Sequence, residues 1–171
     1  RTEQVVNGVE WTLEAGIRPG LNMLFGNLGD TKETLQKAVD FLIEYDDQAQ
    51  RRTIRPVTPY PGSPLYYMAI ERGLLEGPAD FYEKKHLNSD LLCCNFTELS
   101  DEEVYAALED ANKQLAVNFF DSNRDNALSQ IEYLYREKDT TFRGFRQGMK
   151  SQGKSAPATG ASFGAAASDS M

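Results

Sequence analysis

The fold is decided by residues 21–44, which read LNMLFGNLGDTKETLQKAVDFLIE. Their first part, 21–25, is a short apolar run without a helical face, which predicts a buried strand. Residues 26–29 read Gly-Asn-Leu-Gly and predict a tight loop. Asp30 is expected to cap the helix that follows, with Glu33 in the matching position of a capping box. A strand, a glycine loop and a helix in this order predict a βα unit of a parallel sheet.

A second strand, loop and helix follow the first unit. The strand is predicted over roughly residues 52–57. The stretch TPYPGSP at 58–64 then excludes regular structure, because it contains three prolines and a glycine. A short helix over 65–72 ends at Gly73, and another helix is predicted ahead of the first strand, over 2–15. The helix of the first unit carries an apolar stripe at helical spacing, formed by Leu35, Ala38, Val39, Leu42 and Ile43.

The pattern beyond residue 76 is mainly helical. Residues 77–86 form a polar, aromatic connection. Ser100 and Glu103 make a second capping box, and an apolar stripe runs from there to about Phe120. A separate helix is predicted over roughly 124–136.

The two ends of the chain set further expectations. Two parallel strands covered on one face do not make a stable domain, so the missing strands are expected upstream of Arg1. Arg1 itself falls inside the first predicted helix, and we expect the sequence to continue a longer protein. Residues 149–171 are rich in Ala, Ser and Gly and are expected to be disordered, because they hold too little apolar surface to offset the entropy of ordering.

Composition and charge exclude several classes of protein. The chain has 18 Lys and Arg against 26 Asp and Glu, a net charge of −8, so a nucleic acid partner is not expected. No apolar run is long enough to span a membrane, and the first thirty residues do not read as a signal peptide. Cys93 and Cys94 lie in 91–96, a short strand or a buried loop. Two adjacent cysteines form no disulfide framework, which favours a cytoplasmic location.

The candidate site lies in the two loops that follow the strands, because function gathers at the carboxyl ends of parallel strands. Glycines in the loop at 26–31 let a ligand approach the backbone, and the helix N-terminus after it favours an anionic partner. The alternative is an ordinary βα turn. The loop at 58–64 is rigid and presents Tyr60, although prolines also simply redirect a chain. Arg55 could face the interior of a barrel, and His86, the single histidine, is expected to be a surface or locally bonded residue.

Together the two loops resemble part of a known family. The sequence reads LFGNLGDT at 24–31, PYPGSPL at 59–65 and GLL at 73–75. These motifs are similar to the C-terminal half of a radical S-adenosylmethionine (radical SAM) barrel. In that family the fifth strand ends in a pattern close to G-x-P-G-E-T, and one close to P-Y-P-G-T-x-L follows the sixth. The resemblance is strongest to the subgroup with an upstream cobalamin-binding domain, such as the magnesium-protoporphyrin ester cyclase type. Members of that subgroup often continue with an S-x-E-E helix, as at 100–103 here.

The sequence departs from the family pattern in four places. Leu28, Asp30 and Ser63 stand where the family usually has Pro, Glu and Thr, which are mild changes. The large departure is the absence of the C-x-x-x-C-x-x-C loop that binds the family's [4Fe–4S] cluster. Cys93 and Cys94 do not replace it, because two adjacent thiolates without further ligands do not make a cluster site. We therefore expect the isolated chain to be inactive and its cysteines to be buried small hydrophobic residues.

The resemblance implies an α/β fold: the C-terminal part of a partial parallel (β/α) TIM-like barrel, followed by a helical extension and a disordered tail. The implied boundaries are 1–75 for the barrel part, 76–148 for the extension and 149–171 for the tail. A reduced cluster would donate an electron to S-adenosylmethionine and release methionine and a 5′-deoxyadenosyl radical, which abstracts hydrogen from substrate.

The implied cofactors are S-adenosylmethionine, a [4Fe–4S] cluster with ligands outside this chain and, in the subgroup, cobalamin. The implied partners are a small-molecule substrate and a reductant protein. No catalytic residue and no metal ligand is assigned to this chain. The residues implied to bind cofactor are Leu24, Gly26, Asn27, Gly29, Pro59, Tyr60 and Gly62.

Two other interpretations of the sequence are compatible with the same patterns. In the first, residues 75–145 are a non-catalytic helical interaction domain attached to a βα fragment. In the second, the chain is a βα fragment of another barrel or of a nucleotide-binding enzyme. The upstream sequence discriminates them, since the radical SAM reading requires a cysteine triad there and the interaction reading does not.

Overall fold

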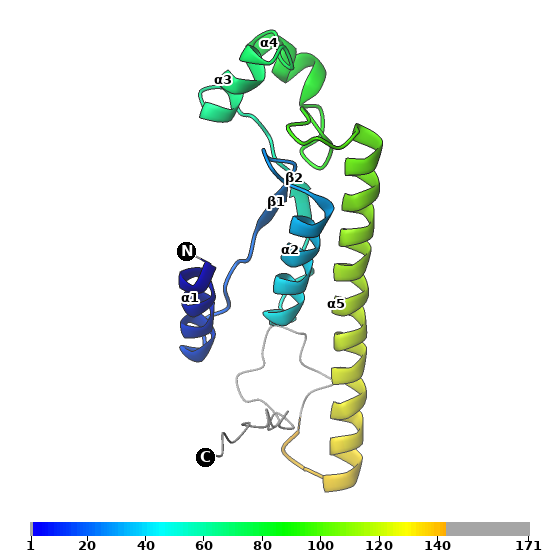
Figure 1. Cartoon of the computed structure of the whole chain (residues 1–171). Coiled ribbons are helices and arrows are strands. Elements are labelled where there is room, and N and C mark those ends of the chain that lie inside the picture. The colour runs from blue at the N-terminus through cyan, green and yellow to red at the C-terminus, as the bar shows by residue number, and fades with distance from the viewer. Residues whose placement is uncertain (1, 143–171) are drawn as a thin grey trace, which may run out of the picture. The chain divides into compact units, whose positions relative to one another are not determined.

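The computed structural model describes residues 2–142 (Figure 1). Two compact units divide the chain, Arg1–Arg124 and Asp125–Met171, and the first contains both strands and both candidate loops. The elements in chain order are α1 (Thr2–Glu14), β1 (Met23–Phe25), α2 (Lys32–Glu44), β2 (Ile54–Pro56), α3 (Pro64–Glu71), α4 (Pro78–Asp80), the π-helix η1 (Phe81–Lys85) and α5 (Asp101–Glu137).

The sheet of the described residues consists of two parallel strands, which confirms a mixed α/β architecture. Leu24 of β1 lies opposite Arg55 of β2 in the register. One residue beyond β2, the Val57 N–H donates to the Phe25 carbonyl at 2.8 Å. The order β1, α2, β2 is the parallel βαβ unit that the sequence predicts.

The main core lies on one face of this sheet. Phe25 and Ile54 are buried there against the apolar stripe of α2, as predicted, and against one side of α5. The buried helical side chains of this cluster are Leu35, Val39 and Leu42 from α2 and Val104, Leu108, Ala111 and Leu115 from α5. The other face is uncovered: the Leu24 side chain is 63% exposed, and Arg55 is exposed beside it. The predicted buried strand is thus buried on one face only, at Phe25, because helices cover only that side.

The start of α2 differs from the prediction. Its N-cap is Thr31, whose hydroxyl accepts from the Thr34 N–H, while the Thr34 hydroxyl accepts from the Thr31 N–H. Asp30 and Glu33 were expected to form this capping box. Asp30 is not free to do so, because its carboxylate binds the backbone of the preceding loop.

Helix α5 is continuous, so the predicted break between residues 120 and 124 was wrong. The polar residues there do not interrupt it. The Asn123 side chain donates to the Phe119 carbonyl one turn earlier at 2.7 Å, and Arg124 pairs with Asp121 at 2.9 Å. No proline or glycine stands in this segment, so nothing stops propagation of the helix. The predicted capping box of Ser100 and Glu103 at its N-terminus is confirmed.

The segment between α3 and α5 packs into a second core. Residues 78–85 are helical, which corrects the expectation of a simple connection, and 91–96 form a buried loop rather than a strand. This core contains Tyr66, Ala69, Leu75, Phe81, Cys93, Cys94 and Phe96. The predicted tail at 149–171 lies outside the described residues. Among residues 2–142, none of the helices combines the length and apolar character needed to cross a membrane.

Candidate functional site

The two candidate loops leave the sheet side by side. Because β1 and β2 are parallel, both carboxyl ends lie at the same edge of the sheet. The contact between them is close, since a Cβ added to Gly26 would lie 3.9 Å from the Val57 side chain. The structure therefore brings together the starts of both predicted loops.

The first loop is closed by its own aspartate. Asp30 Oδ2 accepts hydrogen bonds from the N–H groups of Gly26 at 3.1 Å and Asn27 at 2.9 Å. The Asn27 side chain in turn accepts from the Leu28 N–H. Gly26 and Gly29 have φ angles of +99° and +78°, a region that glycine enters without steric cost. The N–H groups of Gly26 and Asn27 are thus already bonded to a carboxylate of the chain itself. The loop presents instead the exposed Asn27 and Leu28 side chains.

The second loop is held rigidly, as its prolines predict. Pro59 is fully buried, which fixes the chain after β2. The Ser63 N–H donates to the Tyr60 carbonyl at 3.0 Å, closing a turn with Pro61 and Gly62 at its centre. Gly62 has a φ angle of +93°, as the third residue of a type II turn requires. Of the predicted residues here, only Tyr60 presents a polar side chain, and it is 51% exposed.

Tyr60 meets a residue to which the sequence assigns no functional role, His86. The Tyr60 hydroxyl lies 3.4 Å from His86 Nε2, and the two rings meet edge-on with centroids 5.2 Å apart. The His86 ring is stacked on Phe81, with centroids 4.9 Å apart and planes inclined by 15°. Twenty-six positions separate the tyrosine from the histidine, so no local motif signals the pair. The sequence offers only a weak signal, a single histidine that follows the aromatic residues Phe81 and Tyr82 by one helical turn.

Two ion pairs, one formed by a residue of β2 and one by a residue just before it, differ in burial. Arg55 Nε lies 2.9 Å from an oxygen of Asp90, and both side chains are more than half exposed on the uncovered side of the sheet. Arg52 is buried, with Nη2 donating to Asp47 at 2.8 Å and to the Pro19 carbonyl at 3.1 Å. Its Nε and Nη1 atoms have no hydrogen-bond partner among the described residues. Arg52 therefore fixes the chain ahead of β2, and Arg55 is the cation that a ligand on the uncovered face would meet.

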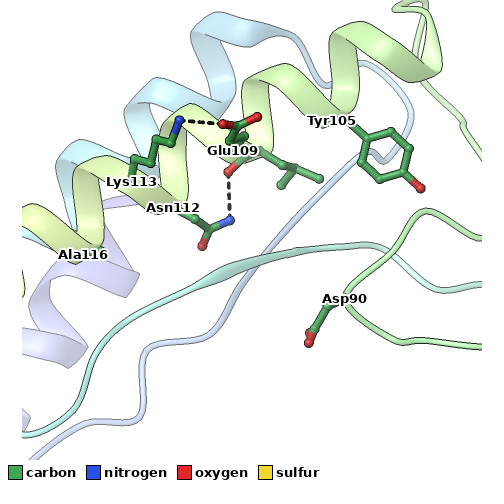
Figure 2. Close-up of a pocket in the computed structure, with 7 residues that line it drawn as sticks. Asp90, Tyr105, Glu109, Asn112, Lys113 and Ala116 are labelled. Atoms are coloured by element: carbon green, nitrogen blue, oxygen red, sulfur yellow. Dashed lines mark hydrogen bonds and ion pairs between the residues drawn. The ribbon is translucent and has the colours of Figure 1, made fainter.

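A groove of about 490 Å³ lies beside α5 and was not foreseen from the sequence. Figure 2 shows its lining, which comes mainly from α5 together with Asp90 from the loop opposite. Lys113 pairs with Glu109 on the same helix, which raises the pKa of Lys113. The Tyr105 hydroxyl accepts from the Leu92 N–H at 3.1 Å. Most polar groups of the groove are thus bonded within the protein, so the groove is a weaker candidate for ligand binding than the loops.

One groove residue, Asn112, closes an edge of the sheet. Its Oδ1 accepts from the Ile54 N–H at 3.0 Å, and its Nδ2 donates to the Ile54 carbonyl at 2.9 Å. The bond from Val57 to Phe25 shows that alternate residues of β2 face β1, so Ile54 directs its backbone groups to the outer side. The carboxamide of Asn112 occupies the place where a further strand would pair. Pro56, the other outward residue of β2, has no N–H to offer.

The cysteines are structural in character. Cys93 and Cys94 are buried, with their sulfur atoms 3.9 Å apart. Burial raises the pKa of Cys93, and burial with the neighbouring thiol raises the pKa of Cys94 to about 12. Both groups are therefore neutral thiols at physiological pH. Within residues 2–142 no group of three or more His, Cys, Asp or Glu side chains is arranged to hold a metal ion.

No protein-family model matches the chain, and no curated protein and no solved structure was found to match it.

Proposed function

We propose that this chain is the C-terminal part of a radical SAM enzyme. In this proposal β1, α2 and β2 form the last part of a partial parallel (β/α) barrel, and the helices from α3 onward form its extension. The enzyme would cleave S-adenosylmethionine reductively and use the resulting radical on a small-molecule substrate. The boundaries at residues 75 and 148 and the cytoplasmic location remain predictions.

The observation that carries the proposal is the one-sided sheet. Helices cover the face of the sheet that carries Phe25 and Ile54. The side chains of Leu24 and Arg55 lie on the opposite face and are exposed. A (β/α) barrel has this organisation, with helices outside its strands and a second set of side chains inside. In the proposed enzyme, Leu24 and Arg55 would face the barrel interior.

The two edges of the sheet support the same conclusion. The outer edge of β2 is closed by Asn112 and by Pro56, so no strand is expected beyond it. The outer edge of β1 has no strand partner among the described residues, and Leu24 directs its backbone groups to that side. Strands are therefore expected to add before β1, which is the direction from which a C-terminal barrel fragment would continue.

The residues fit the proposed cofactors unequally. An adenosyl group over the strand ends would meet the exposed Leu24 side chain, the glycine loop and the loop from Pro59 to Gly62. The cluster does not fit this chain, because its two cysteines are adjacent, buried and held as neutral thiols. In the proposed enzyme the cluster ligands would lie outside this chain, and cobalamin, where the subgroup uses it, would bind in an upstream domain. This chain's role would be to bind and orient the cofactor and substrate, whose chemistry the cofactor supplies.

The first test is the reading frame upstream of the Arg1 codon. The proposal expects an open frame that encodes C-x-x-x-C-x-x-C upstream of the strand that would pair with β1. If the frame instead opens close to Arg1, or continues without such a triad, the proposal is wrong.

The second test uses the complete protein that this frame encodes. Reconstitution with iron and sulfide should yield an enzyme that forms 5′-deoxyadenosine from S-adenosylmethionine in the presence of dithionite. Replacement of the three upstream cysteines by alanine should abolish that product. Replacement of Cys93 and Cys94 by alanine is the matched control and should leave cluster content unchanged. Loss of cluster in the control would refute the assignment of these two cysteines as structural.

A second candidate function has one supporting observation. Leu128, Ile131 and Tyr135 lie at the spacing of one helix face on α5, and each is at least 40% exposed. Such a face is suited to a partner helix and favours the reading of a non-catalytic interaction domain. The reading frame distinguishes the two functions, because the interaction domain requires no upstream cysteine triad.

A further inference from the structure

The position of His86 is produced by a π-turn. In η1 the His86 N–H donates to the Phe81 carbonyl, five residues earlier, at 2.8 Å. An α-helical turn would bring residue 85 back to Phe81 instead. The extra residue of the π-turn sets the His86 ring on the Phe81 ring, which is fully buried. π-turns of this kind are rare and occur frequently at functional sites.

The two nitrogens of the His86 ring have different surroundings. Nδ1 is buried and has no hydrogen-bond partner among the described residues. Nε2 lies 3.4 Å from the Tyr60 hydroxyl. A buried N–H without an acceptor is rarer than a buried acceptor without a donor. The neutral ring is therefore expected to carry its proton on Nε2 and to leave Nδ1 bare.

This tautomer fixes what the Tyr60 hydroxyl can do. If Nε2–H donates to the Tyr60 oxygen, the hydroxyl hydrogen of Tyr60 must point elsewhere. The Tyr60 ring is also held by Phe81, with centroids 5.7 Å apart, and by the buried Pro59 before it. Its hydroxyl is thus a positioned donor at the carboxyl end of β2, where ligands bind in parallel α/β folds.

We propose that Tyr60 is a substrate-recognition residue that donates a hydrogen bond to a substrate oxygen, such as a carboxylate, and that His86 is its positioning residue. The location of the substrate rests on the proposed function. The pairing of Tyr60 and His86 rests only on the contacts within this chain.

The tautomer can be measured directly, since His86 is the single histidine of the sequence. A long-range ¹H–¹⁵N spectrum of the ¹⁵N-labelled 171-residue chain should show one imidazole, protonated at Nε2. Tyr60→Phe should shift the Nε2 signal, because the acceptor is removed. Tyr82→Phe is the matched control, because among the described residues the Tyr82 ring contacts Phe81 and makes no ring contact or hydrogen bond with His86. A ring protonated at Nδ1, or equal shifts in both variants, would overturn the positioning role.

The recognition role is tested with sodium benzoate as a rigid carboxylate probe. Titration into the chain should shift the His86 and Tyr60 signals, and Tyr60→Phe should bind about fivefold more weakly for the loss of one net hydrogen bond. Tyr82→Phe should bind like the wild type. Absence of shifts, or equal binding by Tyr60→Phe, would overturn the recognition role. None of these measurements requires a cluster or S-adenosylmethionine. A negative result would therefore overturn the role of Tyr60 or His86 without bearing on the proposed radical SAM function.

Discussion

Removal of the Asn112 carboxamide should weaken the attachment of α5 to the outer edge of β2. In Asn112→Ala the N–H and the carbonyl of Ile54 lose the partners that they contact at 3.0 and 2.9 Å. Within residues 2–142 neither group has another hydrogen-bond partner, since both face away from β1. The third bond of the side chain, to the Leu108 carbonyl, matters less, because that carbonyl lies within helix α5.

The expected loss follows from the two orphaned backbone groups. Each unsatisfied buried group costs about 1–3 kcal/mol, which gives an upper range of about 2–6 kcal/mol for the pair. The groove beside Asn112 admits water to this edge, which favours the lower half of that range. Alanine also improves the helix by up to about 0.7 kcal/mol relative to asparagine. We therefore expect the free energy of unfolding to fall by about 2–3 kcal/mol.

The assay combines urea denaturation with amide exchange. Unfolding is best followed by circular dichroism, because the single tryptophan, Trp11, is 67% exposed on α1. Exchange of the Ile54 amide should accelerate by roughly 30- to 150-fold, the factor that corresponds to this loss of free energy. Gln114→Ala on the same helix is the control, because its bonds to Gln36 and Asp110 are exposed. If Asn112→Ala lies within about 0.5 kcal/mol of this control, the edge-closing role is refuted.

Three further predictions concern the loops and the buried thiols. Gly26→Ala should lower the free energy of unfolding by about 1–2 kcal/mol, because Gly26 has a φ of +99°. Gly8→Ala in α1, which has open space around it, should raise it by up to about 1 kcal/mol, so thermal unfolding should shift in opposite directions in the two variants. Asp30→Ala should speed exchange of the two loop amides that it binds, while Asp40→Ala on the exposed side of α2 should not. Folding raises the pKa of Cys94 from 9.0 to about 12, so above pH 9 the thiol ionises in the unfolded chain before it ionises in the folded one. The contribution of this thiol to the free energy of unfolding is therefore complete below pH 9 and is lost as the pH rises toward 12. The urea midpoint should fall less between a pH below 9 and about pH 11 in Cys94→Ala than in the wild type, and an equal fall in both would contradict the burial of this thiol.

The sequence predicted most of the fold where local patterns act alone. The α2 stripe, both strands, the turn at Gly73 and the capping box of Ser100 follow from periodicity and turn chemistry. The prediction failed where tertiary contacts decide. Whether β1 is buried on one face or two depends on how many helices cover it, which an apolar run does not encode. The break expected in α5 failed because polar residues such as Asn123 bond within the helix rather than end it.

The candidate site was predicted in outline but not in its bonding. Both loops lie where strand order places them, and the rigid turn at Pro61 and Gly62 is as expected. The role of Asp30 was missed, because a carboxylate before a helix fits a cap equally well. The pair of Tyr60 and His86 depends on a π-turn, and no spacing rule in the sequence signals one. The implied cofactor contacts of both loops stay predictions.

The unequal edges of the sheet also limit how copies of this chain can associate. A strand with two open edges can recruit neighbours on both sides and grow into a fibre. Here Asn112 and Pro56 block one side, so the part of the chain that the structure describes offers a single backbone edge, that of β1. Two molecules that meet through that edge form a closed pair with a two-fold axis, and nothing remains for a third to extend. Misassembly through this sheet would therefore terminate at a dimer.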